Sequence, residues 1–560
     1  MPTFTSNHEP FPIPTGLNFA DFVLQTCDAH GRRDPDALAL VDPTHADRSV
    51  RFRDVSHRVH NLARQFRHRL QVQPDDVILL VLPNSVEFLQ IVLAAVLEGV
   101  VVSQCNPAAA ARELEYQIHN SGAKYLFFDR RTMETGMEVA NRCRNQIKAV
   151  ILADYHHNLH LTSTDSNAGI PTFHLSYSSN PSNYTKPVKM ARGNSVAFIP
   201  YSSGTTGFPK GVMITHDNLV AQVVAFHEMI QRNIWSHLVP SGTQMSMFGS
   251  SDVISLPLYH LFGFSVTLLN LHAGRQSVIM HKFAIEKYME TIERYKPPYL
   301  FMVPPVALKF TKDPCVRSYN TSSVQIIITS AAPLARDLID ELYKVHPHVR
   351  HVMQAYGMTE LTAFATLAGL APLGNCGQLG MNVACKIIDP DTQAELEHGA
   401  VGEVWIRSPC LMVGYLNNEK ATRSAIKDGW IRTGDIAYCD TNGFIYVVDR
   451  LKELIKVRGY QVAPAELESL LLSHPSIADS AVIGVSIDRR TGDEAPKAYV
   501  VLKHGAHATE EQLQAFVAGQ VSRYKQLTGG IEFVTEIPKS PSGKILRRLL
   551  RDQNSKVANL

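Results

Sequence analysis

The sequence predicts an α/β protein in two parts. The first is a large N-terminal domain of layered α/β subdomains with a small β-subdomain, and the second is a small α+β domain. Three observations predict this fold class. Strand and helix patterns alternate along the first part of the chain, which is typical of layered α/β architecture. Residues 377–448 form short strand-like runs separated by Gly and Pro. The roughly 110 residues after them carry helix and strand patterns of their own, enough for a separate domain.

The alternation is clearest early in the chain. We expect strands at 76–82, 99–103 and 125–128, and helices at 85–97 and 113–121. Ser85 is a helix start signal, and Gly99 is a stop signal. Residues 156–194 are rich in Ser, Asn, Thr and Pro, so a long irregular connection is expected there.

A domain boundary is expected near residues 449–452, so that the predicted domains span residues 1–450 and 451–560. Within the first, the β-subdomain covers about 377–448. Beyond the boundary we expect, in order, a helix at 464–472 that begins with Pro464, a strand at 481–485, a helix opened by a capping box of Thr509 and Gln512, and a strand at 531–534.

Composition excludes several classes of protein. The chain has 560 residues, 45% hydrophobic and 19% charged, with a net charge of +2, so overall charge recruits neither nucleic acid nor a membrane. Eight cysteines occur without a C-x-x-C pair, which indicates reduced thiols in an intracellular compartment. The most apolar segment, near residues 91–97, is too short to span a bilayer. One basic run suits either a solvated helix or an anion-facing surface: Lys539, Lys544, Arg547, Arg548 and Arg551.

Residues 201–212 combine four hydroxyl side chains, three glycines and one lysine, directly after a strand predicted at 196–199. Glycine lets backbone N–H groups approach an anion, hydroxyls donate to phosphate oxygens, and Lys210 adds a positive charge. The spacing matches neither the P-loop nor the Rossmann fingerprint. The loop by itself therefore suits a solvated turn as well as a phosphate site.

Three further motifs carry groups suited to nucleotide chemistry. Thr359 offers a hydroxyl and Glu360 an oxygen ligand for Mg²⁺, although both residues also suit the start of a helix. Asp435 follows Gly434 and is suited either to accept from both ribose hydroxyls or to close a turn. Lys544 lies beyond a tight turn, and its alternative is an ordinary surface lysine.

In their order and combination these motifs resemble the adenylate-forming superfamily of acyl-CoA synthetases, luciferases and peptide-synthetase adenylation domains. The resemblance covers about residues 34–551. It is strongest to 4-coumarate–CoA ligases and related fungal acyl- and aryl-CoA ligases, because residues 450–466 and 537–547 are nearly those of the plant ligase motifs.

The resemblance implies two half-reactions. A carboxylate attacks the α-phosphorus of ATP to give acyl-AMP and pyrophosphate, and the thiol of coenzyme A then displaces AMP. Glu360 would hold Mg²⁺, and Lys544 would act in catalysis beside the attacking carboxylate and the α-phosphate. The residues implied for ATP and AMP binding are Ser202, Ser203, Gly204, Thr205, Thr206, Lys210, Gln354, Gly357, Thr359, Asp435, Arg450, Lys452 and Lys544.

The resemblance also implies a moving domain. Lys452 takes the hinge position, and rotation there would withdraw Lys544 from the adenylate. The groups brought in for the second half-reaction would be Arg458 and Gly459 for coenzyme A, and Lys456 and Gln461 for catalysis.

The implied acyl pocket contains a histidine, His260, that would gate the carboxylate or assist the thiol; a core histidine is its alternative. Its other members would be Tyr259, Ala331, Tyr356 and Met358. After Glu360 the plant ligases carry Ala-Gly-Pro where this chain has Leu-Thr-Ala, so the resemblance does not imply a cinnamate substrate. Apolar neighbours favour a hydrophobic acid, aromatic or medium-chain. A family arginine at coenzyme A falls near His272.

Two alternatives stay open at this point. Within enzymes, the alternative is an acyl-AMP ligase that loads a carrier protein; in another class, it is a non-catalytic nucleotide-binding scaffold. The ending Ala558-Asn559-Leu560 resembles the tripeptide read by the peroxisomal import receptor, so a peroxisomal location is expected, with a cytoplasmic one as the alternative.

Overall fold

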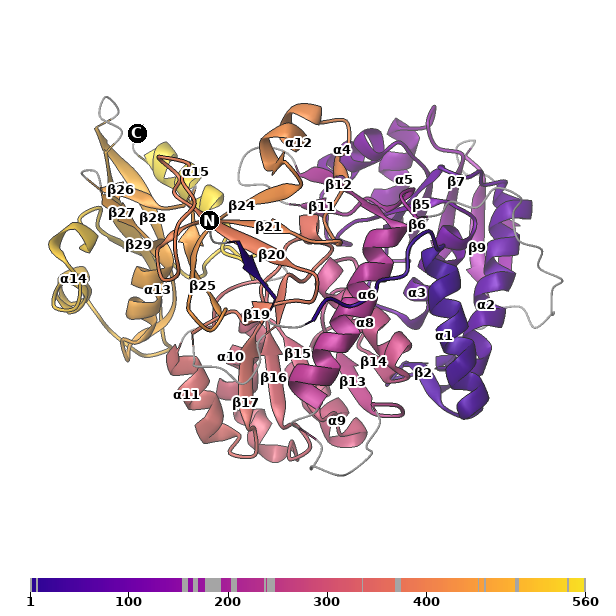
Figure 1. Cartoon of the computed structure of the whole chain (residues 1–560), viewed down its shortest axis with the longest axis horizontal. Coiled ribbons are helices and arrows are strands. Elements are labelled where there is room, and N and C mark those ends of the chain that lie inside the picture. Colours follow the sequence, from indigo (N-terminus) through magenta and orange to yellow (C-terminus); the bar gives the residue numbers. More distant parts are fainter. Residues whose placement is uncertain are drawn as a thin grey trace.

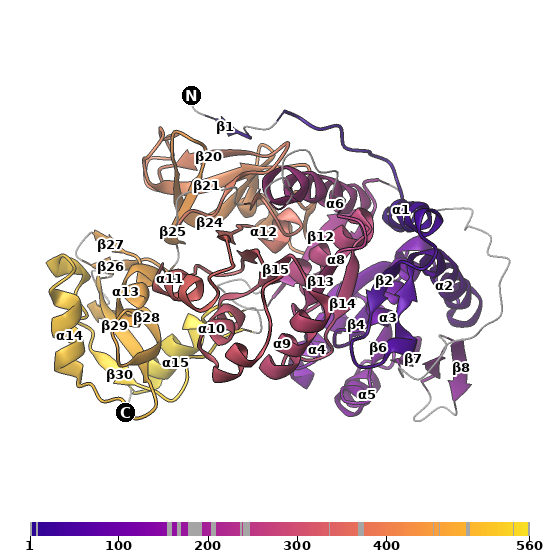
Figure 2. The same ribbon diagram turned by 90° about the horizontal axis from the view of Figure 1, so that it is seen from below.

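The computed structural model describes most of the chain: residues 3–6, 9–153, 160–164, 170–176, 193–202, 209–235, 238, 247–334, 336–367, 374–451, 453–457, 460–488, 493–540 and 543–557. Figures 1 and 2 show a large N-terminal part and, at one end of it, a small C-terminal domain drawn in yellow.

The largest sheet has ten strands, in the order β11-β12-β10-β5-β4-β6-β7-β9-β8 with β22 paired to β12. Its centre is parallel and consists of β4 (Val77–Val81), β5 (Val101–Gln104), β6 (Ala123–Phe128) and β7 (Ala149–Ala153). The connecting helices are α3 (Val86–Leu97), α4 (Ala111–Ser121) and α5 (Met133–Arg142). The elements predicted between residues 76 and 128 are confirmed. Ser85 caps α3 by accepting from the Phe88 N–H at 3.2 Å, and Gly99 takes a φ of 73° beyond its end.

One edge of this sheet corrects a prediction. Residues 156–194 include two strands, β8 (His160–Thr164) and β9 (Thr172–Ser176), where an irregular connection was expected. Strand β9 pairs parallel with β7, and β8 pairs antiparallel with β9. Each of these strands is stabilised by pairing with a neighbouring strand, which local periodicity does not reveal.

The opposite edge carries the predicted phosphate loop. This edge consists of the strands β10 (Val196–Phe198), β11 (Tyr201–Ser202), β12 (Lys210–Thr215) and β22 (Gly414–Tyr415), and the loop connects β11 to β12. Ser202 and Lys210 are direct antiparallel partners, so the two ends of the loop lie opposite each other.

Two smaller sheets complete the α/β layers. One contains β13 (Ser251–Ile254), β14 (Gln276–Ile279), β2 (Leu38–Val41) and β3 (Val50–Arg51), and the other contains β15 (Tyr299–Met302), β16 (Ile326–Thr329) and β17 (His351–Gln354). The helices around them are α1 (Phe19–Arg33), α2 (Phe52–Gln65), α6 (His216–Ile230), α8 (Leu261–Ala273), α9 (Ile285–Tyr295), α10 (Pro304–Lys312) and α11 (Arg336–Val345). Buried aliphatic and aromatic side chains join these layers into large cores.

The β-subdomain is a six-stranded sheet in the order β1-β20-β21-β24-β23, with β25 paired to β24. Its strands are β1 (Phe4–Thr5), β20 (Ala384–Ile388), β21 (Gly402–Arg407), β23 (Ile426–Lys427), β24 (Trp430–Cys439) and β25 (Ile445–Arg450). In the β24–β25 pair, Asp435 lies directly opposite Arg450. This register joins two side chains that the sequence placed in separate motifs.

The C-terminal domain has a core of its own. Its three-stranded sheet consists of β28 (Ile477–Asp488), β29 (Asp493–Leu502) and β30 (Ile531–Phe533), beside the hairpin β26 (Ile455–Val457) and β27 (Tyr460–Val462). Its helices are α13 (Pro464–Leu472), α14 (Glu510–Ala518) and α15 (Arg547–Val557). The capping box of Thr509 and Gln512 is present at α14. Among the described helices, none has the length and apolarity needed to cross a membrane.

Candidate active site

A cavity of about 1300 Å³ lies where the C-terminal domain meets the N-terminal part. Its walls come from α4, the β11–β12 hairpin, the turn before α8, the segment after β17, the β24–β25 pair and the loop that precedes α15. Nine of the predicted site residues line it: Ser202, Lys210, Tyr259, His260, Met358, Thr359, Glu360, Arg450 and Lys544. The fold thus gathers side chains from motifs spread over more than half of the chain.

Several predicted residues cannot be placed. Ser203, Gly204, Thr205, Thr206, Lys452, Arg458 and Gly459 lie outside the described residues, as does the side chain of Gln461. Lys456 is described. It lies exposed on β26 and is not among the residues that line the cavity.

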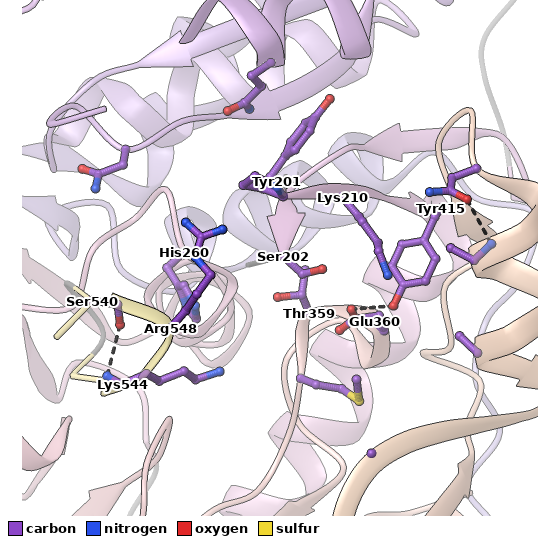
Figure 3. A pocket seen from close by; sticks show the side chains of 18 of the residues that line it. Tyr201, Ser202, Lys210, His260, Thr359, Glu360, Tyr415, Ser540, Lys544 and Arg548 are labelled. Atoms are coloured by element: carbon purple, nitrogen blue, oxygen red, sulfur yellow. Dashed lines mark hydrogen bonds between the residues drawn. The ribbon is translucent and has the colours of Figure 1, made fainter. Parts of the chain in front are cut away.

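Glu360 lies on a single 3₁₀ turn, Thr359–Leu361, just after β17. The residue is 6% exposed, and its carboxylate accepts a hydrogen bond of 2.9 Å from the Tyr415 hydroxyl. Burial and the carboxylate of Glu360 raise the pKa of Tyr415, so this tyrosine stays protonated and donates. The Lys210 ammonium lies 4.8 Å from the centre of the same ring (Figure 3). Tyr415 thereby holds the anion and the cation of this wall in fixed positions.

Asp435 and Arg450 form a second charged pair. The Arg450 Nε lies 3.2 Å from the Asp435 Oδ1, and the Tyr356 hydroxyl donates to Asp435 Oδ2 at 2.5 Å. Burial and the negative charge of Asp435 hold the pKa of Tyr356 well above its usual value, so Tyr356 also stays a donor. The acyl-pocket role of Tyr356 stays a prediction; its hydroxyl fixes the carboxylate that is expected to bind ribose.

Lys544 comes from the C-terminal domain. It lies on a tight turn in which its backbone N–H donates to Ser540 Oγ at 3.1 Å and the Gly543 N–H donates to Ser540 O at 2.8 Å. In Figure 3 the side chain extends from this loop into the cavity. Burial and then the positive charge of Arg450 lower the pKa of Lys544, although nearby carboxylates oppose this.

The loop of Lys544 rests on the N-terminal part. Gly543 has a φ of 83°, and a Cβ at this position would lie 2.7 Å from Pro305 Cδ, at the start of α10. Glycine is therefore required here both for its backbone conformation and for the close approach. This contact between the two domains sets the position of Lys544.

His260 is the residue before α8, and its Nδ1 accepts from the Phe262 N–H at 3.3 Å. Burial and the charge of Lys544 lower the pKa of His260 to about 4, so its ring is neutral at physiological pH. It lines the cavity, and a fully enclosed core histidine is excluded. His272 differs: it packs between Phe22 and His227 and is not among the cavity-lining residues.

Gln354, Gly357 and Ala331, like Asp435 and Tyr356, support the site without being among the residues that line this cavity. Gln354 accepts from the Leu334 N–H at 2.8 Å, so it holds the segment that contains Ala331. A Cβ on Gly357 would lie 1.6 Å from Ala363 O, so this glycine permits a close approach of two backbone segments. Ala331 has a φ of 76°, a left-handed conformation that is unusual for a residue with a side chain.

Sequence analysis missed Tyr415, whose hydroxyl is the partner of Glu360. It also missed Glu403, which lines the cavity and accepts from the Gly434 N–H at 3.2 Å. Neither residue belongs to a motif with phosphate or metal chemistry. The tight turn at Gly434 was the one available signal, because its backbone N–H needs an acceptor from another segment.

Comparisons with known proteins show the family to which this chain belongs. The sequence model of the family described as AMP-binding enzyme matches residues 27–416, and that of the AMP-binding enzyme C-terminal domain matches residues 466–544. The chain is 38% identical to a 4-coumarate:CoA ligase of Petunia hybrida over 86% of its own length and 85% of that protein. It is 35% identical to a probable 4-coumarate–CoA ligase of Dictyostelium discoideum over 98% of both. The solved structure of ATP-bound MatB from Rhodopseudomonas palustris superposes with a TM-score of 0.80 at 24% identity, over 95% of this chain and 99% of that one.

This chain therefore belongs to the AMP-binding enzyme family. The superfamily resemblance stated from the motifs is confirmed, and so is the predicted fold class. The domain boundary near residues 449–452 stays a prediction, and the residue roles are taken up as proposals below.

Proposed function

We propose that this protein is an AMP-forming acid–CoA ligase that activates a hydrophobic carboxylic acid, aromatic or medium-chain, and transfers it to coenzyme A. The curated relatives are 4-coumarate–CoA ligases, which supports the class of reaction. One observation carries the assignment: a lysine from the small domain enters the same cavity as Arg450, Lys210 and Glu360. That arrangement suits a reaction in which two anions must meet.

In the first half-reaction, a carboxylate oxygen attacks the α-phosphorus of ATP. The new O–P bond forms as the bond to pyrophosphate breaks, so acyl-AMP and pyrophosphate result. Negative charge gathers at the α-phosphate in the transition state. The ammonium of Lys544 neutralises that charge, and Lys210 faces the departing phosphates. Asp435 and Arg450 hold the ribose hydroxyls, because an acceptor and a donor stand side by side there.

Glu360 fits the requirements of a magnesium ligand. One of its oxygens accepts from Tyr415, which leaves the other for a cation. Magnesium in such enzymes is held by one or two carboxylates together with substrate phosphates, so a single protein carboxylate suffices. The bound cation would neutralise phosphate charge. Thr359, next to Glu360, donates its hydroxyl to the α-phosphate.

In the second half-reaction, the thiolate of coenzyme A attacks the acyl carbonyl, and AMP leaves with the electrons of the broken C–O bond. We propose that the small domain rotates about Lys452 for this step, withdrawing Lys544 and presenting Arg458, Gly459, Lys456 and Gln461. Lys456 is exposed and outside the cavity in the present arrangement, which fits the adenylate-forming state.

The reaction is tested by trapping acyl-AMP as hydroxamate across a library of carboxylic acids, with and without coenzyme A and Mg²⁺. We expect pyrophosphate release with hydrophobic aromatic or medium-chain acids, and thioester only when coenzyme A is added. Acyl-AMP without thioester would favour loading of a carrier protein. Pyrophosphate release with none of the acids would favour a non-catalytic scaffold and contradict the proposal.

For location we propose peroxisomal import through Ala558-Asn559-Leu560. The support is the likeness of this tripeptide to the import signal alone. Fluorescently tagged chains with and without these three residues test it in cells that contain the import receptor. Loss of peroxisomal signal in the truncated chain alone is the expected result. A cytoplasmic signal in both would refute it.

A further inference from the structure

Three potential metal ligands come together where α4 meets the end of α5. Glu115 and His119 are one helical turn apart on α4, and Cys143 follows the last residue of α5. Their ligand atoms all lie within 4.8 Å of one another. None of the three is among the residues that line the active-site cavity, so the cluster is separate from the chemistry described above.

The spacing of the atoms fits a tetrahedral metal. Cys143 Sγ and His119 Nε2 are 3.5 Å apart. In tetrahedral zinc sites the metal–sulfur distance is about 2.3 Å and the metal–nitrogen distance about 2.0 Å, which places the two ligand atoms about 3.5 Å apart. An S–H donating to nitrogen gives a similar separation, so the spacing admits a metal without requiring one.

A second observation concerns the proton on His119. The amide nitrogen of Gln146 donates to the carbonyls of Ile118 and Ala123, at 2.8 Å each, which fixes the orientation of this amide. Its oxygen therefore faces His119 Nδ1 at 3.2 Å. Because an amide oxygen only accepts, Nδ1 must carry the proton, and Nε2 presents its lone pair to Cys143. Metal-binding histidines are typically held in this way by an acceptor on the other ring nitrogen.

Charge and exposure also suit a divalent cation. Cys143 is 3% exposed, whereas His119 is exposed to solvent and leaves a route of entry. A thiolate and the Glu115 carboxylate would balance a charge of +2. The positive charge that opposes cation binding is that of Arg142. Its Nη1 lies 3.4 Å from Glu115 Oε2, and its Nη2 pairs with Glu138. Arg142 is half exposed and free to keep the Glu138 contact alone.

We propose that Glu115, His119 and Cys143 form a binding site for a zinc-class divalent cation, with water as the fourth ligand. A thiolate and an imidazole select borderline metals such as Zn²⁺ or Co²⁺ over Mg²⁺. The bound ion joins α4 to the end of α5. Because α4 also lines the active-site cavity through other residues, the ion stabilises one wall of that cavity from behind.

Cobalt titration of the chelator-treated, reduced full-length protein, without nucleotide, tests the site. We expect one equivalent of Co²⁺ to give a sulfur-to-cobalt charge-transfer band together with tetrahedral d–d bands, and Zn²⁺ but not Mg²⁺ to remove both. Cys143→Ser should abolish the charge-transfer band. His119→Gln should weaken binding at least about 10-fold, and Gln146→Ala about 10-fold.

Cys315→Ser is the matched control, because Cys315 is a partly exposed thiol on another subdomain. Its cobalt spectrum should equal that of the parent chain. His119 is exposed, so its variant is expected to fold, and far-ultraviolet circular dichroism checks each variant. The proposal is overturned if stoichiometric Co²⁺ gives no charge-transfer band, or if the band survives Cys143→Ser.

Discussion

The two sides of the cavity are built differently. On the N-terminal side, two carboxylates are each held by a tyrosine hydroxyl: Glu360 by Tyr415 at 2.9 Å and Asp435 by Tyr356 at 2.5 Å. On the C-terminal side, the ammonium of Lys544 has no hydrogen-bond or ion-pair partner within the described parts of the chain. Only its backbone is fixed, by the turn at Ser540 and the contact of Gly543 with Pro305.

Together with the proposed function, this difference predicts that the two sides of the cavity serve the two half-reactions differently. The N-terminal side is preorganised, so its groups need no rearrangement when nucleotide binds. Lys544 is positioned by domain docking, so its contribution is present only while the small domain occupies this arrangement. Variants on the two sides should therefore differ in which half-reaction they affect.

The largest effect is expected from Lys544→Ala. Loss of one preorganised positive group should slow acyl-AMP formation about 10²–10³-fold, measured by pyrophosphate exchange. Thioester formation from supplied acyl-AMP should change less than about threefold. Lys525→Ala is the control, because Lys525 pairs with Glu466 at 2.7 Å within the small domain. Equal losses in both half-reactions would contradict the division of labour.

The next effect concerns the N-terminal side. Asp435→Asn weakens the pair with Arg450, and hydrogen bonds to charged groups are worth about 1.5–3 kcal/mol, so the KM for ATP should rise about 10- to 100-fold. Tyr356→Phe should raise the KM for ATP about 3- to 10-fold, because the Asp435 carboxylate remains but loses the hydrogen bond that orients it. Tyr446→Phe serves as the matched control, because Tyr446 contacts Asp440 at 3.5 Å in the same sheet. An unchanged KM in Asp435→Asn would exclude a role at the nucleotide.

A smaller effect tests the docking contact. Gly543→Ala introduces both left-handed strain and a clash with Pro305, so adenylation should fall about 10-fold while thioester formation is retained. Adding Pro305→Ala should recover part of the loss, because it removes the clash but not the strain. Gly505→Ala is the control for left-handed strain at another turn of the small domain. Gly505 has a φ of 73° with no atom within 4 Å of an added Cβ, and this variant should adenylate normally. If adenylation does not recover in the double variant, the contact with Pro305 does not position the loop that carries Lys544.

The smallest effect is a shift in pH dependence. The pKa of Lys544 is lowered by burial and by Arg450, so its ammonium deprotonates below the usual pH. As pH rises through that pKa the positive charge is lost, and kcat/KM for ATP in pyrophosphate exchange should fall before pH 10.5, the ordinary value. Lys544→Arg should move this basic limb to higher pH, because guanidinium keeps its charge. If the basic limb of the pH profile does not move in Lys544→Arg, the titrating group is not Lys544.

Local features of the sequence predicted much of this fold. Ser85, Pro464 and the Thr509–Gln512 box are local signals that each mark the start of a helix, and all three helices begin where expected. The strands β8 and β9 escaped notice because they depend on pairing between separate segments, of β9 with β7 and of β8 with β9, and not on a local periodic pattern. Dependence on long-range contacts also explains which site residues the sequence did not reveal. Glu360 and Asp435 belong to recognisable motifs, whereas Tyr415 carries no local signal.

The amino-acid sequence alone determined the layered α/β class, the family and the chemical identity of the charged groups, because these depend on residue type and short-range spacing. Tertiary structure decided which groups act together. The Glu360–Tyr415 and Asp435–Tyr356 bonds join residues 55 and 79 positions apart, and no periodic pattern encodes such pairs. The Gly543–Pro305 contact and the meeting of Cys143 with His119 likewise exist only once separate elements pack. Their geometry depends on the packing of whole domains and helices.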